Sequence, residues 1–286
     1  MPKDTISKDA RSRRICIFCG GNSGSRITKE HIFGEWLKKF FPRDETTTHK
    51  SFYIEWPDES GPRPAREKWT QGQGHVGSKK LLVLCRLCNN ERLSGLEDRA
   101  RSALPPLIVG DRSNLPPAEQ SVLATWAAKT AMVVEHSKPI DSGIPQEARS
   151  WLLANMTPPS EKWFVWIAAY GGKKWRDLSI YQSRVGLSDA PVSRPSAAPH
   201  YAQATTFGLG RVLFCVVSSD SPAIEIFRGR ETEGVFQIWP PQDRSILWPP
   251  RRVLNDDEAN AISNILENSR AFDHSLDPGA NWTFAF

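Results

Sequence analysis

The sequence of 286 residues lacks any apolar run of the roughly 20 residues that a membrane-spanning helix requires. Its first 14 residues carry several charges and no apolar stretch follows them, which argues against a secretory signal. We therefore expect a chain that is neither exported nor embedded in a membrane, and that is cytoplasmic. Hydrophobic residues make up 39% and charged residues 24% of the chain, as is typical of a folded protein rather than a disordered one.

Acidic residues are scarce in the first part of the chain relative to basic ones. Residues 1–115 contain 21 Lys and Arg against 14 Asp and Glu, whereas residues 116–286 contain 16 against 18. The net charges of the two parts are therefore +7 and −2. A localised positive charge suits a phosphate backbone, so the first part is the candidate for contact with nucleic acid.

Cysteine is rare, but four of the five cysteines are paired in the sequence as Cys16 with Cys19 and Cys85 with Cys88. Two C-x2-C pairs predict a tetrahedral Zn²⁺ site, because each pair can turn both sulfurs toward one ion. Four sulfur ligands leave no open position for substrate, so the predicted zinc is structural. A disulfide framework is the alternative, and a reducing compartment disfavours it. The fifth cysteine, Cys215, lies in an apolar run and is expected in the core.

Patterns along the chain predict an α+β protein with two domains. We expect a basic tail over residues 1–13, a first domain over 14–104 with an insertion at about 43–78, a Pro-rich linker over 105–117 and a second domain over 118–286. In the first domain a short helix is expected to end at Pro42 and a helix after Cys88 to stop before Pro105, and strands are predicted at 51–56, 66–71 and 80–84. In the second domain the predicted helices are 117–136, 145–156 and 256–268, and the predicted strands are 162–170, 178–183, 205–218 and 223–227.

The order of residues around the cysteine pairs resembles the HNH, or ββα-metal, endonucleases that carry four zinc-binding cysteines. The resemblance covers residues 14–104 and rests on Glu30-His31 between the pairs and on Asn89 directly after Cys88. In that family the acidic residue and the His end a β-strand, and the Asn begins the following helix. The resemblance implies a small ββα-metal domain clamped by zinc and followed by an α+β accessory domain.

The same resemblance implies hydrolysis of phosphodiester bonds in DNA, with RNA left open as a substrate. Glu30 and Asn89 would be ligands of a catalytic Mg²⁺ or Mn²⁺, which prefers oxygen ligands. His31 would be the general base, because an imidazole with an ordinary pKa of about 6.5 can take a proton from water near neutral pH. The resemblance also implies a restriction-type or antiviral defence role.

The middle residue of the family's motif has no unique counterpart in this sequence. His75 is the candidate and His49 the reserve, and Asn90 is a substitute for Asn89. Glu97, about two turns along the predicted helix, contributes only if that helix leans over the site. Four further residues near the motif are candidate phosphate contacts, although solvated surface charge is the default reading: Lys79, Lys80, Arg86 and Arg92.

The second half of the sequence carries no comparable motif. Its near-neutral charge argues against a large surface for DNA, and its tryptophans are expected mainly in the core. Sensing a ligand, binding a partner protein and self-association all remain open for this half. The rival hypothesis for the whole chain is a non-catalytic zinc module that binds nucleic acid or protein, with Glu30, His31 and Asn89 as surface and capping residues.

Overall fold

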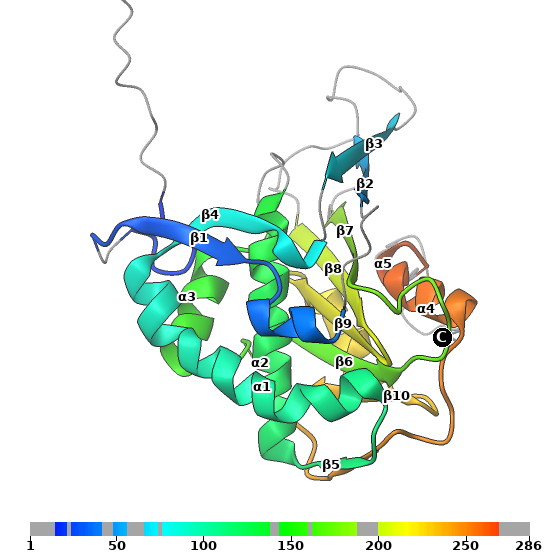
Figure 1. Cartoon of the computed structure of the whole chain (residues 1–286). Helices are drawn as coiled ribbons and strands as arrows, with labels where there is room; N and C mark the ends of the chain where they lie inside the picture. The colour runs from blue at the N-terminus through cyan, green and yellow to red at the C-terminus, as the bar shows by residue number, and fades with distance from the viewer. Residues whose placement is uncertain are drawn as a thin grey trace, which may run out of the picture.

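The computed structural model describes residues 15–21, 24–41, 48–55, 66–73, 76–137, 143–159, 162–187 and 200–268. The fold is mixed α and β, as the sequence predicts, with a four-cysteine cluster near the N-terminus. Figure 1 shows the two-stranded sheet of β1 and β4 on one side of helix α2 and a larger sheet on the other. No helix among the described residues combines the length and the apolar character needed to cross a membrane.

The region that bears the cysteine pairs is built on two antiparallel strands. Strand β1 (Ile27–His31) pairs with β4 (Lys80–Cys85), with a register shift between Thr28 and Lys29. Between them in sequence lies a hairpin formed by β2 (Thr48–Glu55) and β3 (Arg66–Gln73), within the predicted insertion. Short helices complete the region: η1 (Glu35–Lys39), η2 (Val76–Ser78) and the π-helix η3 (Cys88–Arg92).

Helix α1 (Ser94–Val109) continues through Pro105 and Pro106, so the prediction that it stops before them is wrong. The two prolines remove two helical hydrogen bonds, at a cost of about 3 kcal/mol or more each. Burial of Leu107 and Ile108 offsets part of that cost, at about 1.5–3 kcal/mol for each side chain. The helix ends instead at Gly110, whose φ of 82° is the left-handed C-cap conformation.

The larger sheet has five antiparallel strands among the described residues, in the order β10-β6-β9-β8-β7. The strands are β6 (Trp163–Ala169), β7 (Ser179–Leu187), β8 (His200–Leu209), β9 (Val212–Ser219) and β10 (Val235–Trp239). Both faces of β9 are buried, with alternate side chains in two different hydrophobic clusters. A strand covered on both faces is apolar throughout, which is why this run gives no alternating pattern in the sequence.

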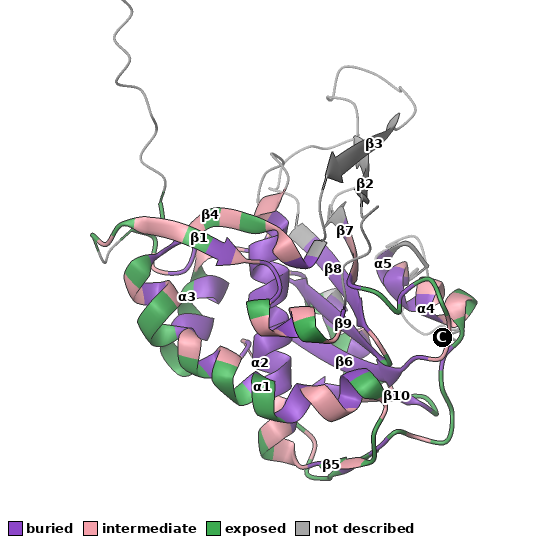
Figure 2. Cartoon of the chain, in the orientation of Figure 1, coloured by how far each residue is buried: buried purple, intermediate pink, exposed green. Residues whose placement is uncertain are grey.

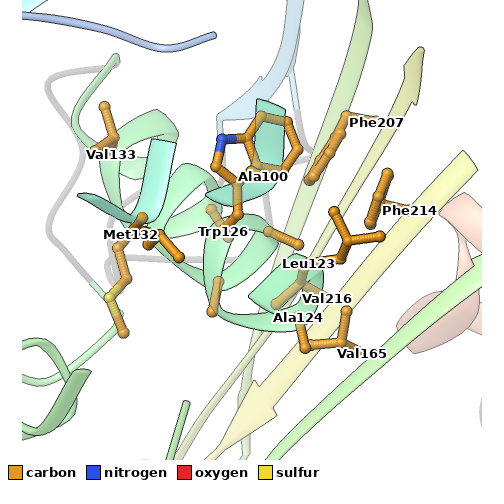
Figure 3. Packing of buried hydrophobic residues seen from close by; sticks show 14 of the residues in the cluster. Ala100, Leu123, Ala124, Trp126, Met132, Val133, Val165, Phe207, Phe214 and Val216 are labelled. Carbon is orange, nitrogen blue, oxygen red and sulfur yellow. The ribbon is translucent and has the colours of Figure 1, made fainter. Parts of the chain in front are cut away.

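Helices cover the two faces of this sheet. Helix α2 (Pro117–Val134) packs on one face, while α4 (Asp256–Ser263) and α5 (Ile265–Asn268) pack on the other. Figure 2 shows α2 buried along most of its length, because the sheet lies on one side of it and α1 on another. In Figure 3 the Trp126 ring of α2 faces Phe207 and Phe214, with centroid distances of 5.8 Å and 5.9 Å.

Several expectations for the second half are confirmed and two are wrong. Helices α2 and α3 (Gln146–Asn155) and strands β6 and β7 match predicted segments, and Cys215 is buried in the core. The predicted helix 256–268 is formed by α4 and α5, and β10 was not predicted. The predicted strand 205–218 is instead a hairpin of β8 and β9, because Gly210, with φ of 63°, makes the turn. The predicted strand 223–227 is the 3-10 helix η5 (Pro222–Phe227). A helical turn buries Ile224 and Phe227, so hydrophobicity alone misassigned the segment.

Residues 105–117, predicted as a linker, contain the last turn of α1, strand β5 (Ser113–Leu115) and the first residue of α2. Strand β5 pairs with β11 (Ile246–Trp248), which is far away in sequence. One cluster of buried hydrophobic side chains includes Leu107 and Leu115 of this segment together with Leu104 before it and Leu123 after it. The two predicted halves therefore share a core, and α1 packs directly on α2.

Candidate functional site

The four cysteines of the two pairs come together in space. Cys16 and Cys19 lie in a turn before β1, Cys85 ends β4 and Cys88 begins η3. Their sulfur atoms all lie within 4.8 Å of one another. The β1–β4 pairing thus joins two turns that are more than sixty residues apart in the chain.

This cluster has the geometry of a metal site. A tetrahedral ion with metal–sulfur bonds of about 2.3 Å holds its sulfurs about 3.8 Å apart, and Cys19 Sγ and Cys85 Sγ are 3.8 Å apart. Burial raises the pKa of the Cys16 thiol and of the Cys88 thiol. A cation among the sulfurs would favour the thiolate forms that burial disfavours. The four cysteines can therefore bind a metal such as zinc.

A second site is a pocket of about 360 Å³ between β1, η1, η3, α1 and α2. Three residues singled out from the sequence line it together: Glu30 and His31 from the end of β1 and Asn89 from η3. Asn90 and Glu97 line it as well. The remaining lining residues come from η1, the η3–α1 segment and α2: Gly34, Glu35, Trp36, Leu93, Ser94, Asp98, Arg101 and Lys129.

His31 has an unusual position in this pocket. Its Nε2 atom is buried and has no hydrogen-bond partner among the residues that the structure describes. The pKa of its imidazole is lowered, first by burial and then by the positive charge of Lys80. A histidine that is neutral near pH 7 and lines a pocket can act as a general base toward a bound water.

Glu30 is not a free carboxylate, because Lys129 of α2 reaches it from the second half of the chain. The Lys129 ammonium bonds Oε1 of Glu30 and lies 3.0 Å from Oε1 of Glu97. Its side chain is 1% exposed. Burial by itself would lower the pKa of Lys129, but the charges of Glu97 and Glu30 outweigh burial, so the pKa is raised and the lysine stays charged.

The two carboxylates bound by Lys129 differ in how many hydrogen bonds their oxygens accept. Glu97 accepts a bond from the Trp126 indole at 3.1 Å on Oε1, in addition to Lys129, and one from the Trp36 indole at 3.1 Å on Oε2. Glu30 has Lys129 on Oε1 and no hydrogen-bond donor among the described residues on Oε2. Glu30 therefore keeps one oxygen for a ligand, whereas Glu97 orients its neighbours.

Asn89 is fixed against β1 by its amide nitrogen. Nδ2 donates to Oγ1 of Thr28 at 3.1 Å and to the carbonyl of Lys29 at 3.4 Å. Because the nitrogen faces the strand, the amide oxygen carries no hydrogen bond from a described residue and is the part available for a ligand. Asn90 is exposed, and its backbone carbonyl accepts a hydrogen bond from the Ser94 hydroxyl at 2.7 Å.

The pocket lining carries more negative than positive charge. Four carboxylates, Glu30, Glu35, Glu97 and Asp98, face two cations, Arg101 and Lys129. Such a lining favours a cation and repels a bare phosphate. A divalent ion on the open oxygens of Glu30 and Asn89 fits this lining, and it would have to share Glu30 with Lys129.

Sequence reasoning missed Lys129, which lies forty residues beyond Asn89. The signal available was a single charge in an almost wholly apolar helical segment, Ala127 to Val134, where a buried lysine needs a carboxylate partner. Nothing in the sequence identified that partner.

Other predicted site residues lie elsewhere or outside the described part of the chain. His75 falls outside the described residues, and His49 is on β2, opposite Gly72, with its side chain outside them. Lys79, Lys80, Arg86 and Arg92 do not line the pocket. Arg86 lines a neighbouring groove instead.

The comparisons with known proteins found no matching family model, no matching curated protein and no matching solved structure. The geometry of the two sites therefore carries the functional argument.

Proposed function

We propose that this chain is a metal-dependent endonuclease of the HNH type that hydrolyses phosphodiester bonds in DNA. The observation that carries the proposal is the meeting of Glu30, His31 and Asn89 in one pocket, with the His31 Nε2 atom buried and without a partner among the described residues. These residues are up to sixty positions apart in sequence. Lining one pocket makes them candidates for a shared chemical role.

In the proposed reaction His31 is the general base. Water bonded to the imidazole gives its proton to a ring nitrogen as the water oxygen attacks the phosphorus, and the bond from phosphorus to the 3′ oxygen breaks. The leaving 3′ oxygen takes a proton from solvent. The lowered pKa of His31 keeps the imidazole neutral, as this step requires.

Glu30 and Asn89 would hold a Mg²⁺ or Mn²⁺ ion through Oε2 and Oδ1. Bound there, the ion would supply positive charge against the negative charge that develops on the phosphate and the leaving oxygen. Lys129 binds Oε1 of Glu30, which leaves Oε2 for the ion. The four-cysteine cluster would hold a structural zinc that ties the turn before β1 to the start of η3.

The local architecture supports the proposal. Strands β1 and β4 pair antiparallel and lead into η3 and α1, which is the strand, strand and helix order of the resembled family. Glu30 and His31 end β1, and Asn89 directly follows Cys88 of the second cysteine pair.

The proposal is tested by incubating the purified protein with plasmid DNA and Mg²⁺ or Mn²⁺. We expect wild type to cut the plasmid and His31→Ala to lose at least about a hundredfold in rate, the lower range for removing a general base. His31→Ala should keep its circular dichroism spectrum and its zinc content. Unchanged cutting by folded His31→Ala would refute the assignment of the base.

Two other residues of the pocket, one Asn and one Glu, provide matched controls for the proposed metal ligands. Asn89→Ala and Glu30→Gln should lose cutting and bind Mn²⁺ more weakly. Asn90→Ala and Glu35→Gln, which alter exposed side chains of the same pocket, should keep both. Equal losses in the control variants would argue against specific ligands.

One observation favours a second candidate function, a non-catalytic zinc module that binds nucleic acid or protein. Lys129 already neutralises Glu30, so the pair has a structural explanation as a buried ion pair. The module hypothesis predicts that wild type binds no Mn²⁺ at the pocket and cuts no substrate with any divalent ion. Electron paramagnetic resonance of Mn²⁺ added to zinc-loaded protein separates the two candidates.

A further inference from the structure

A groove of about 630 Å³ lies beside the pocket, along the paired strands β1 and β4. Its lining comes from the segment before β1, from β1, from β4 and from the residue after β4: Ser25, Arg26, Ile27, Thr28, Lys29, Leu82 and Arg86. Three of these side chains are cations, and no lining residue is acidic. The groove therefore has the opposite charge character to the pocket.

The three cations of the groove are exposed and uncompensated. Arg26, Lys29 and Arg86 form no ion pair with any carboxylate in the described part of the chain. Pairing of β1 with β4 holds these residues together, since the backbone N–H of Arg86 donates to the carbonyl of Arg26 at 2.8 Å. Three cations that strand pairing holds together form a surface that attracts anions.

The groove and the pocket meet along β1. Thr28 and Lys29 line the groove, and Glu30 and His31, the next two residues, line the pocket. Asn89, a pocket residue, donates hydrogen bonds to both Thr28 and Lys29. A chain of phosphates that enters the pocket can therefore continue into the groove.

We infer that Arg26, Lys29 and Arg86 bind the phosphate backbone of DNA next to the phosphate in the pocket. The inference rests on the proposed function for the identity of the pocket's ligand. Phosphate fits because its charge is repeated along the strand, so successive phosphates can meet successive cations. The chain's own N-terminal tail is a poor occupant, because it contains Arg11, Arg13 and Arg14.

The test measures DNA binding separately from cutting. Fluorescence anisotropy with a labelled single-stranded oligonucleotide, without added Mg²⁺ or Mn²⁺, compares wild type with the triple variant Arg26→Gln/Lys29→Gln/Arg86→Gln. Each lost phosphate contact should lower the logarithmic salt slope by about 0.7, so three contacts should weaken binding about a hundredfold at 0.1 M salt. The control, Lys173→Gln/Lys174→Gln/Arg176→Gln, removes the same charge from exposed residues of the second half and should bind as wild type does.

A small phosphodiester, bis(p-nitrophenyl) phosphate, reports on the pocket alone. We expect the triple variant to hydrolyse it at the wild-type rate while losing affinity for DNA. Wild-type DNA affinity in the triple variant, equal loss in the control variant, or equally tight binding of polyglutamate would each overturn the inference. Failure of wild type to hydrolyse either substrate would refute the proposed function, and the binding comparison would still decide the groove.

Discussion

Replacing Lys129 with Met tests the ion-pair network that joins the pocket to helix α2. The substitution keeps the length and apolar stem of the side chain but leaves Glu30 and Glu97 facing each other without a cation. Their side chains are 10% and 19% exposed, so water can compensate them only in part. Removing one partner of a buried ion pair costs about 3–5 kcal/mol. That is a large share of a typical stability of roughly 5–15 kcal/mol.

Urea unfolding followed by tryptophan fluorescence measures this loss. Lys38→Met is the matched control, because Lys38 pairs with Glu35, whose side chain is 66% exposed, and should cost no more than about 1 kcal/mol. Glu97→Gln should be less destabilising in the Lys129→Met background than in wild type, by about 1–3 kcal/mol. A Lys129→Met variant within about 1 kcal/mol of wild type, or additive effects of the two substitutions, would refute the reasoning.

Two further predictions concern the close packing at η1 and the cysteine cluster. A Cβ on Gly34 would lie 2.6 Å from Oε2 of Glu97, so Gly34→Ala should break the hydrogen bond from the Trp36 indole to Glu97. The variant should lose about 1–3 kcal/mol of stability in urea unfolding. Gly95→Ala, which meets nothing within 4 Å, should instead stabilise the chain by about 0.4–1 kcal/mol; stabilisation by both would contradict the packing argument. Cys85→Ser should abolish bound zinc in elemental analysis and lower the melting temperature, whereas Cys215→Ser should keep its zinc; full zinc content in Cys85→Ser would exclude the four-sulfur site.

Local features of the site could be predicted because they depend on short sequence spacing. A C-x2-C pair can turn two sulfurs to the same side whatever surrounds it, and the structure does bring the four sulfurs together. The strand before the second pair and the helices of the second half follow from residue periodicity for the same reason. The placement of Glu30 and His31 at a strand end came from the family resemblance and agrees with β1.

The sequence by itself determined the cysteine cluster, most helices and strands, and the candidates Glu30, His31 and Asn89. Only the tertiary structure decided that Lys129 binds Glu30, that two indoles donate to Glu97 and that α1 runs through its prolines. Each of these depends on contacts between residues far apart in the chain, whose energies of burial and ion pairing outweigh local preferences. No local pattern records such contacts, because a lysine in an apolar helix signals the need for a partner without naming it.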